Sequence, residues 1–214
     1  MSNPPNFPLL MAHRGGFGTE NSLQAIKSST HCDIVELDIR KSQEGILYCY
    51  HGNLMEFLFP RLFFHQPFSK LKQKYPTLIT LQEAAKAINN RILFLDIKDT
   101  TISIEELQQV LPANINSVYL ACQNIDYLAT LTTLPSRWKK ICNGGFLRIN
   151  GNLEKIRQLR LDAIEVFFWD YTKQKRTLLR EQHIDVALAR WFLPKKWYHQ
   201  QCDATGSFWR WDEK

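Results

Sequence analysis

The sequence predicts an α/β protein, a compact (β/α)8 TIM barrel formed by a single domain over residues 1–214. Two observations lead to this prediction. Short apolar runs alternate with helix-type segments along most of the chain, and this alternation is typical of βα units around a parallel sheet. The length of 214 residues suits one domain with a sizeable core, although a barrel of this class usually needs about 250 residues.

In the first half of the chain, polar residues mark where helices begin. Asn21 or Ser22 can cap a helix that continues through Ser28, because a short polar side chain satisfies free backbone N–H groups there. Thr80, with Glu83 three residues later, forms a capping box. We therefore expect strands at Leu9–Ala12, Asp33–Ile39, Ile46–Tyr50 and Ile92–Ile97, with a second helix at Ile79–Asn89.

The second half continues the same alternation. Strands are expected at Val118–Cys122, Lys140–Cys142, Ala163–Trp169 and Val186–Trp191, and helices at Ile104–Leu111, Asp126–Leu134, Leu153–Leu161 and Lys173–Gln182. This gives about seven βα units where a barrel has eight, so we expect an irregular or incomplete last unit. The alternative is an open doubly wound sheet, but no Gly-x-Gly-x-x-Gly turn follows the first strand.

The composition is that of a folded protein with an excess of basic residues. Hydrophobic residues make up 44% and charged residues 22%, which excludes a largely disordered chain. Lys and Arg outnumber Asp and Glu by 27 to 21, giving a net charge of +6. An excess of this size favours anionic partners such as phosphate esters, nucleic acid or acidic lipid.

The cysteines and the apolar runs indicate in which cellular compartment the protein is expected. Five cysteines are scattered without a Cys-x-x-Cys pair, which argues against a disulfide scaffold and against a thiolate zinc site. No apolar run approaches the roughly 20 residues of a membrane span, and the first residues lack the features of a signal peptide. We therefore expect reduced thiols and a cytoplasmic location.

Three carboxylates lie near the ends of two predicted strands. Glu36 and Asp38 are two residues apart and so share one face of their strand, and Asp96 ends a later strand. Carboxylates inside nearly continuous apolar runs are costly unless they are paired or bind a metal ion. Because no thiolate accompanies them, the sequence predicts a site for a hard divalent cation, Mg²⁺ or Ca²⁺.

Cations and imidazoles follow the same strand ends. His13 and Arg14 end the first strand, His51 follows Ile46–Tyr50, and Lys98 lies two residues after Asp96. In a barrel, active sites form at the carboxyl ends of the strands. Negative charge on phosphate oxygens is stabilised by a divalent ion with Arg and Lys, and two imidazoles can exchange protons near neutral pH. These residue types together favour chemistry on a phosphate ester.

The order of these pieces resembles the glycerophosphodiester phosphodiesterase family. The resemblance covers roughly Leu9 to Asp99 and is carried by Ala12-His13-Arg14-Gly15-Gly16, Glu20-Asn21-Ser22, Glu36-Leu37-Asp38-Ile39, His51, Thr80-Leu81-Gln82-Glu83 and Asp96-Ile97-Lys98. It implies a (β/α)8 barrel that hydrolyses glycerophosphodiesters to glycerol 3-phosphate and an alcohol.

The resemblance also implies a role for each matched residue. Glu36, Asp38 and Asp96 would be metal ligands, His13 and His51 the general acid/base pair, and Arg14 and Lys98 the residues that hold phosphate oxygens. The implied partner is a small phosphodiester. The attacking group, which is either the substrate's neighbouring hydroxyl or water, stays open.

The chain departs from that family at several points. Asp96 stands where the family usually has Glu, which shortens this ligand by one methylene. His51 is followed by Gly52 in place of Asp, and the segment after it is short, which implies a reduced lid and a more open site. The family's Trp-Thr-x-Asn strand is not recognisable, although Trp191 lies near its place, and the final strand is at most a vestige in Asp203–Trp211.

Two alternatives remain. One is lysophospholipase D-like activity at a membrane surface, with the apolar stretch Met55–Phe64 touching lipid. The other is a catalytically weakened relative that binds a phosphorylated ligand, which the change at Gly52 favours. Nucleic acid is not expected, because only the net charge favours it. Glu20 is expected to support the site from a helix start, and Glu165 to form a structural ion pair.

Overall fold

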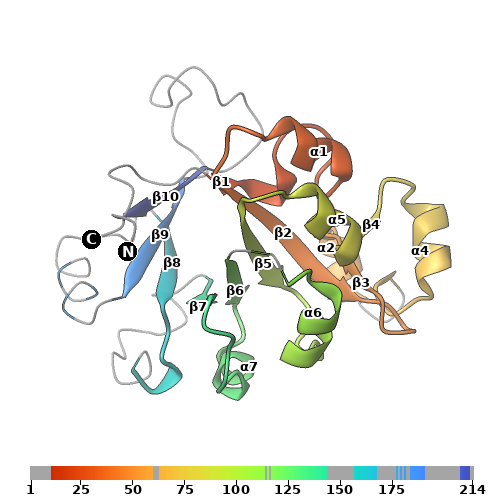
Figure 1. The fold of residues 1–214 in the computed structure, drawn as a ribbon. Helices are drawn as coiled ribbons and strands as arrows, with labels where there is room; N and C mark the ends of the chain where they lie inside the picture. Colours follow the sequence, from red (N-terminus) through yellow and green to blue (C-terminus); the bar gives the residue numbers. More distant parts are fainter. Residues whose placement is uncertain are drawn as a thin grey trace.

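In the computed structural model, the described strands belong to a single sheet (Figure 1). The structure describes residues 11–59, 63–113, 115, 117–143, 157–167, 177, 179, 181, 184–190 and 208–212. The parallel strands are β1 (Met11–Ala12), β2 (Ile34–Lys41), β5 (Ile92–Ile97), β6 (Val118–Cys122), β7 (Trp138–Cys142), β8 (Ala163–Phe167) and β9 (Asp185–Arg190), each paired with the next in this order. The predicted α/β class is confirmed.

The sheet ends on a strand of the opposite direction. β10 (Phe208–Asp212) pairs antiparallel with β9 and contacts β1, at the other end of the series. The strands therefore run round to meet, but the last one does not follow the βα pattern. This is the irregular last unit that the count of βα units predicted.

Helices follow the strands, and most start at a side-chain cap. α1 (Leu23–Ser28) begins at Ser22, whose hydroxyl accepts from Ala25 N, and α5 (Leu81–Ala87) begins at the predicted Thr80–Glu83 capping box. The later helices are α6 (Ile104–Val110), capped by Ser103, and α7 (Ile125–Thr130), capped by Asn124. Of the expected helix Leu153–Leu161, residues 157–161 are described and 157–159 are helical, whereas the expected helix Lys173–Gln182 lies mostly outside the described residues.

One expected barrel strand is instead part of a hairpin. β3 (Leu47–Cys49) runs antiparallel to β2 and also pairs with β4 (Ile79–Thr80). The expected strand at Ile46–Tyr50 is therefore present as β3, but it is not a parallel strand of a βα unit, because a tight turn closed by the Gly45 N–H and the Ser42 carbonyl sends the chain straight back along β2. The excursion between β3 and β4 holds two helices that were not predicted, α2 (Leu54–Leu58) and α4 (Phe68–Lys74).

The strands have apolar side chains on both faces. Ile34 packs with Met11, Phe94 and Ile141 in a cluster inside the barrel, while alternate residues of β2 pack outward in the cluster shared with the helices, namely Val35, Leu37 and Ile39. β2 is buried over nearly its whole length, which explains its lack of polar alternation. The two carboxylates of β2 share the inward face of Ile34 and so point into the barrel.

No helix among the described residues is long and apolar enough to cross a membrane.

Candidate active site and metal centre

Three carboxylates meet inside the barrel where β2 and β5 run side by side. Asp38 lies directly beside Asp96 in the parallel register of these strands, and Glu36 is two residues earlier on the same face of β2. One ligand oxygen from each residue lies within 4.8 Å of the other two. Glu36 and Asp38 are 2% and 1% exposed. The structure therefore brings together the three predicted metal ligands, and they could hold a cation.

Two cations lie against this cluster. Lys98 Nζ is 2.5 Å from Asp96 Oδ2 and 3.1 Å from Asp38 Oδ1, and Arg14 Nε is 3.6 Å from Asp38 Oδ2. Burial lowers the pKa of Lys98, but Asp96 and Asp38 outweigh this and raise it, so its ammonium stays charged. Two positive charges against three carboxylates leave the cluster with an excess of negative charge.

The pKa values of the carboxyl groups reflect that excess. Burial, together with Asp38 and Asp96, raises the pKa of Glu36 well above its usual value. Burial also raises the pKa of Asp96, against the pull of Lys98. Burial acts in the same direction on Asp38, but Lys98, His51 and Asn21 together lower its pKa. Asp38 is thus the best stabilised anion of the three.

The cluster fits a hard divalent cation. Asp96 Oδ1 is buried and has no hydrogen-bond partner, which is costly for a carboxylate oxygen unless a cation takes it. A divalent ion would also relieve the repulsion that raises the Glu36 pKa. Oxygen donors with no thiolate among them are the ligands that Mg²⁺ and Ca²⁺ prefer.

Arg14 is held in an unusual backbone conformation at the end of β1. It lies in the short 3₁₀ turn η1 (His13–Gly15) with φ 51° and ψ 38°, the left-handed region. Its backbone N–H donates to Glu36 Oε2 at 2.5 Å, and its guanidinium contacts Glu20 Oε2 at 2.7 Å. The expected supporting role of Glu20 is therefore a direct contact with Arg14. Strained residues held in this way are common at functional sites.

The two glycines after Arg14 allow its turn to pack on α1. Gly15 and Gly16 both have positive φ, and a Cβ on Gly16 would lie 2.7 Å from the Ser29 side chain. No larger residue fits this turn without displacing α1.

Asn21 is a further residue of the site, for which the sequence predicted no contact with the carboxylates. Its amide donates to Asp38 Oδ2 at 2.9 Å, and its Oδ1 accepts from Asp38 N at 3.0 Å. It is buried and has φ 54°. Its presence in the Glu20-Asn21-Ser22 motif was the only signal for this role.

His13 lies beside the carboxylates. Its Nε2 is 3.8 Å from Glu36 Oε2. Burial, with the nearby Arg14 charge, lowers the pKa of His13 to about 4.

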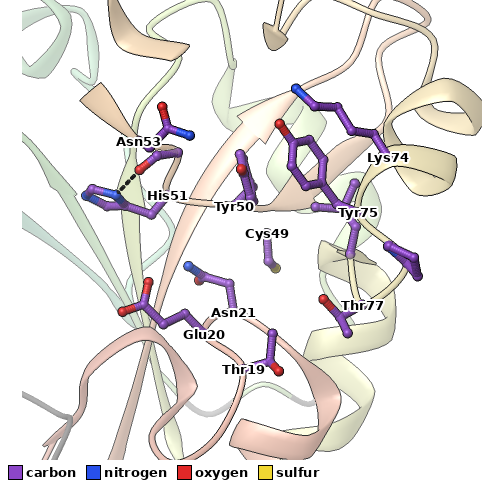
Figure 2. Close-up of a pocket in the computed structure, with 13 residues that line it drawn as sticks. Thr19, Glu20, Asn21, Cys49, Tyr50, His51, Asn53, Lys74, Tyr75 and Thr77 are labelled. Carbon is purple, nitrogen blue, oxygen red and sulfur yellow. Dashed lines mark hydrogen bonds between the residues drawn. The ribbon is translucent and has the colours of Figure 1, made fainter. Parts of the chain in front are cut away.

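His51 is held by its own loop and by Arg40. Its Nδ1 lies 2.7 Å from the Gly52 carbonyl (Figure 2), which favours the tautomer with the proton on Nδ1. Arg40 donates to the carbonyls of Tyr50 and His51 at 3.0 and 2.7 Å, and its guanidinium lies 3.5 Å from the centre of the Phe64 ring. Burial lowers the pKa of His51.

Gly52 stands where the resemblance implied an Asp, and its backbone contacts the His51 ring. Its carbonyl supplies an acceptor for the His51 ring, and its φ of +93° and the closeness of Phe64, 2.8 Å from a Cβ placed there, leave no room for a side chain. The orientation of His51 therefore depends on the backbone and not on an Asp. The sequence could not show this, because Phe64 is distant along the chain.

A pocket of about 480 Å³ opens next to His51. Figure 2 shows residues of the α1 entry, the end of β3 and the end of α4 around it. Its lining residues are Thr19, Glu20, Asn21, Cys49, Tyr50, His51, Gly52, Asn53, Lys74, Tyr75, Pro76, Thr77 and Leu78. Glu20 contacts Arg14 and Asn21 contacts Asp38, so the pocket adjoins the carboxylate cluster.

Glu165 on β8 differs from its expected role. It is buried, and it forms no ion pair with any residue in the described part of the chain. Burial and the charge of Asp96 raise its pKa well above the usual value, and Lys98 opposes them. The expected structural ion pair is therefore replaced by a buried carboxyl close enough to Asp96 and Lys98 to sense their charges.

Comparisons with known proteins support the fold. No protein-family model and no curated protein sequence matches the chain. Among solved structures, an Oleispira antarctica phosphodiesterase in complex with the product sn-glycerol-3-phosphate is similar, with 20% identity, a TM-score of 0.67 and coverage of 86% of this chain and 85% of that one.

Two glycerophosphodiester phosphodiesterases are similar to a comparable degree. The Thermotoga maritima enzyme has 18% identity and a TM-score of 0.65, over 87% of this chain and 86% of that one. The Parabacteroides distasonis enzyme has 15% identity and a TM-score of 0.64, over 86% and 84%. The chain therefore adopts the barrel fold of the glycerophosphodiester phosphodiesterases, as its motifs predicted, with a sequence that has diverged far from theirs.

Proposed function

We propose that this protein is a metal-dependent phosphodiesterase that hydrolyses small glycerophosphodiesters to glycerol 3-phosphate and an alcohol. The observation that carries the proposal is the meeting of Glu36, Asp38 and Asp96 within 4.8 Å, with Lys98 and Arg14 directly against them. A similar barrel has been solved with sn-glycerol-3-phosphate as product, which supports this class of substrate.

In this proposal, the three carboxylates hold Mg²⁺ or Ca²⁺. When bound, the ion would offset negative charge on the phosphate oxygens. Arg14 and Lys98 bind the same oxygens, because both cations already lie at the edge of the carboxylate cluster. Asn21 keeps Asp38 in place through both atoms of its amide.

His13 and His51 serve as the proton-transfer pair. One ring removes the proton from the attacking group, and the other supplies a proton to the oxygen of the departing alcohol. If the attacking group is water, this step gives glycerol 3-phosphate directly; if it is the substrate's neighbouring hydroxyl, it gives a cyclic phosphate that water then opens to glycerol 3-phosphate. The Gly52 carbonyl fixes the His51 tautomer with its proton on Nδ1, which directs Nε2 to the reaction. The pocket beside His51 has room for the alcohol.

We also propose that the protein is a single domain and that it resides in a reducing compartment. One continuous sheet links β1 to β10, which supports one domain over residues 1–214. Cys49 and Cys122 are buried thiols, and burial raises the pKa of Cys122 to about 11. Such thiols resist oxidation and suit a cytoplasmic protein.

Release of glycerol 3-phosphate from glycerophosphocholine tests the activity. We expect turnover by the full chain, loss on chelation, recovery with Mg²⁺ or Ca²⁺, and a fall of about a hundredfold or more in His13→Ala. Circular dichroism would show that the variant is folded. Hydrolysis that survives both chelation and His13→Ala, or no hydrolysis with any divalent ion, would contradict the proposal.

A further inference from the structure

The most exposed apolar side chains of the described residues are grouped at one helix. Leu54 is 76% exposed, Leu58 61% and Phe59 50%, whereas Ile46 follows at 36%. Leu54 and Leu58 are four residues apart and so share one face of α2, and Phe59 directly follows that helix. We call Leu54, Leu58 and Phe59 the α2 apolar surface.

The orientation of the α2 apolar surface is set by hydrogen bonds at the start and on the opposite side of α2. Asn53 and Glu56 form a capping box at the start of α2. Glu56 is buried on the opposite side of the helix, where it accepts hydrogen bonds from the hydroxyls of Tyr50 and Tyr75. These buried contacts fix the rotation of α2. The leucines therefore face outward because of the packing of α2, and not because its end is frayed.

This surface lies at the rim of the candidate active site. Asn53, the residue before Leu54, lines the same pocket as His51 (Figure 2). Lys74 lines the pocket from α4 and pairs with Glu56 of α2 at 3.7 Å. The start of α2, the pocket mouth and the end of α4 thus adjoin one another.

Basic residues lie on α4, which contacts α2 through the Lys74–Glu56 pair. α4 has the sequence FSKLKQK, with three lysines and no acidic residue. Lys70 and Lys74 are exposed, and Lys74 Nζ lies over the rings of Phe63 and Tyr75 at 4.3 and 4.8 Å. Of the nearby carboxylates, Glu56 is buried and pairs with Lys74, and Glu44 accepts from Phe68 N, so the charge of Lys70 has no carboxylate partner among these two.

Apolar side chains beside lysines are typical of surfaces that bind anionic lipid. A stable protein interface needs about 800 Å² per partner, which is far more than three side chains provide. A few side chains do suffice to insert at the level of the headgroups. The net charge of +6 acts in the same direction by attracting the chain to an anionic surface.

We propose that the α2 apolar surface docks this protein on an anionic lipid surface, with Leu54, Leu58 and Phe59 inserted and Lys70 and Lys74 at the headgroups. The docking itself does not depend on the proposed activity. The consequence of docking for the substrate does rest on the proposed function: the pocket mouth would face lipid, so that a lysophospholipid could enter the pocket directly.

Cosedimentation with vesicles tests the docking. The full chain should bind vesicles that contain phosphatidylglycerol and bind weakly to vesicles of phosphatidylcholine alone. Leu54→Ser with Leu58→Ser should weaken binding to the anionic vesicles about tenfold or more. Ile46→Ser is the matched control, because it removes an exposed apolar side chain from the β2–β3 turn, and should bind as the wild type does.

Hydrolysis of glycerophosphocholine separates docking from catalysis. The double variant should keep it, because neither leucine lines the pocket. No binding by the wild type, or equal binding by the double variant, overturns the docking proposal whatever the hydrolysis result. Self-association that the double variant abolishes, with no vesicle binding, overturns it too and assigns the surface to a second copy. Binding without any hydrolysis contradicts the proposed function alone.

Discussion

Glu36 carries a large electrostatic penalty when the site holds no ion. Its carboxyl is buried beside Asp38 and Asp96, and burial with these charges raises its pKa. Among the described residues, its side chain accepts a hydrogen bond from Arg14 N. Glu36→Gln keeps an acceptor for that N–H and removes a charge, so we expect the ion-free protein to gain about 1–3 kcal/mol at neutral pH. Denaturant unfolding after chelation measures this.

The same substitution should abolish stabilisation by metal. The wild type should unfold at a higher temperature when Mg²⁺ or Ca²⁺ is added, because an ion that binds only the folded state stabilises it. Glu36→Gln should lose most of that shift. Glu20→Gln is the control, since Glu20 contacts Arg14 but lies outside the carboxylate cluster, and it should keep the shift. A loss of stability in ion-free Glu36→Gln would contradict the electrostatic account.

Glu165 gives a pH-dependent prediction. Because its pKa is raised in the folded protein, the folded state binds a proton that the unfolded state has already lost above its usual pKa of about 4.5. Its contribution to stability is therefore present below that pH and is lost as the pH rises toward the folded-state pKa. Glu165→Gln should flatten the fall in unfolding free energy as the pH rises above about 4.5, and Glu181→Gln, at an exposed position, is the control. Urea unfolding at several pH values checks this.

The sequence predicted the residues whose spacing alone places them together. Glu36 and Asp38 share a face because a strand alternates, and Asp96 joins them because neighbouring parallel strands end at the same edge. It could not predict the contacts of Arg40 with the loop carbonyls or of Gly52 with Phe64, because these join segments whose meeting depends on the hairpin. For Asn21, the sequence motif was recognised, but its hydrogen bonds with Asp38 were not predicted.

At the scale of elements, helix starts were predictable because their signals are local. The capping box of Thr80 and Glu83 lies within four residues, and the structure forms both of its hydrogen bonds. The direction of β3 was not predictable, because an apolar run does not show which strand it will pair with. α2 and α4 were missed since each is only one or two turns long and depends on packing.

The capping box gives a prediction for α5. Thr80→Ala removes the side-chain acceptor for Glu83 N and a donor to the Glu83 carboxylate, and we expect a loss of about 1 kcal/mol in the free energy of unfolding. Gln82→Ala, at an exposed position in the first turn of the same helix, should have little effect. Equal effects of the two substitutions would show that the box adds nothing. Urea unfolding of both variants makes the comparison.

At the scale of the whole molecule, the barrel depends on an irregular closing strand. β9 pairs with β8 on one side and with β10 on the other, and β10 contacts β1. Without β10, β9 would present an unpaired edge, and the carboxyl end of β1, where His13 and Arg14 begin, would lose a neighbour. The last strand is therefore connected to the candidate site through β1, although it contributes none of the proposed ligands.

Removal of residues 208–214 tests this closure. We expect the midpoint of thermal unfolding to fall by several degrees or more and the folded protein to bind a hydrophobic dye. Stabilisation by metal should also weaken, because the turn after β1 contains the Arg14 N–H that orients Glu36. Removal of residues 213–214 alone is the control, since β10 ends at Asp212, and it should unfold as the full chain does. A chain without β10 that unfolds like the wild type and keeps its metal-induced shift would show that the barrel closes by other means.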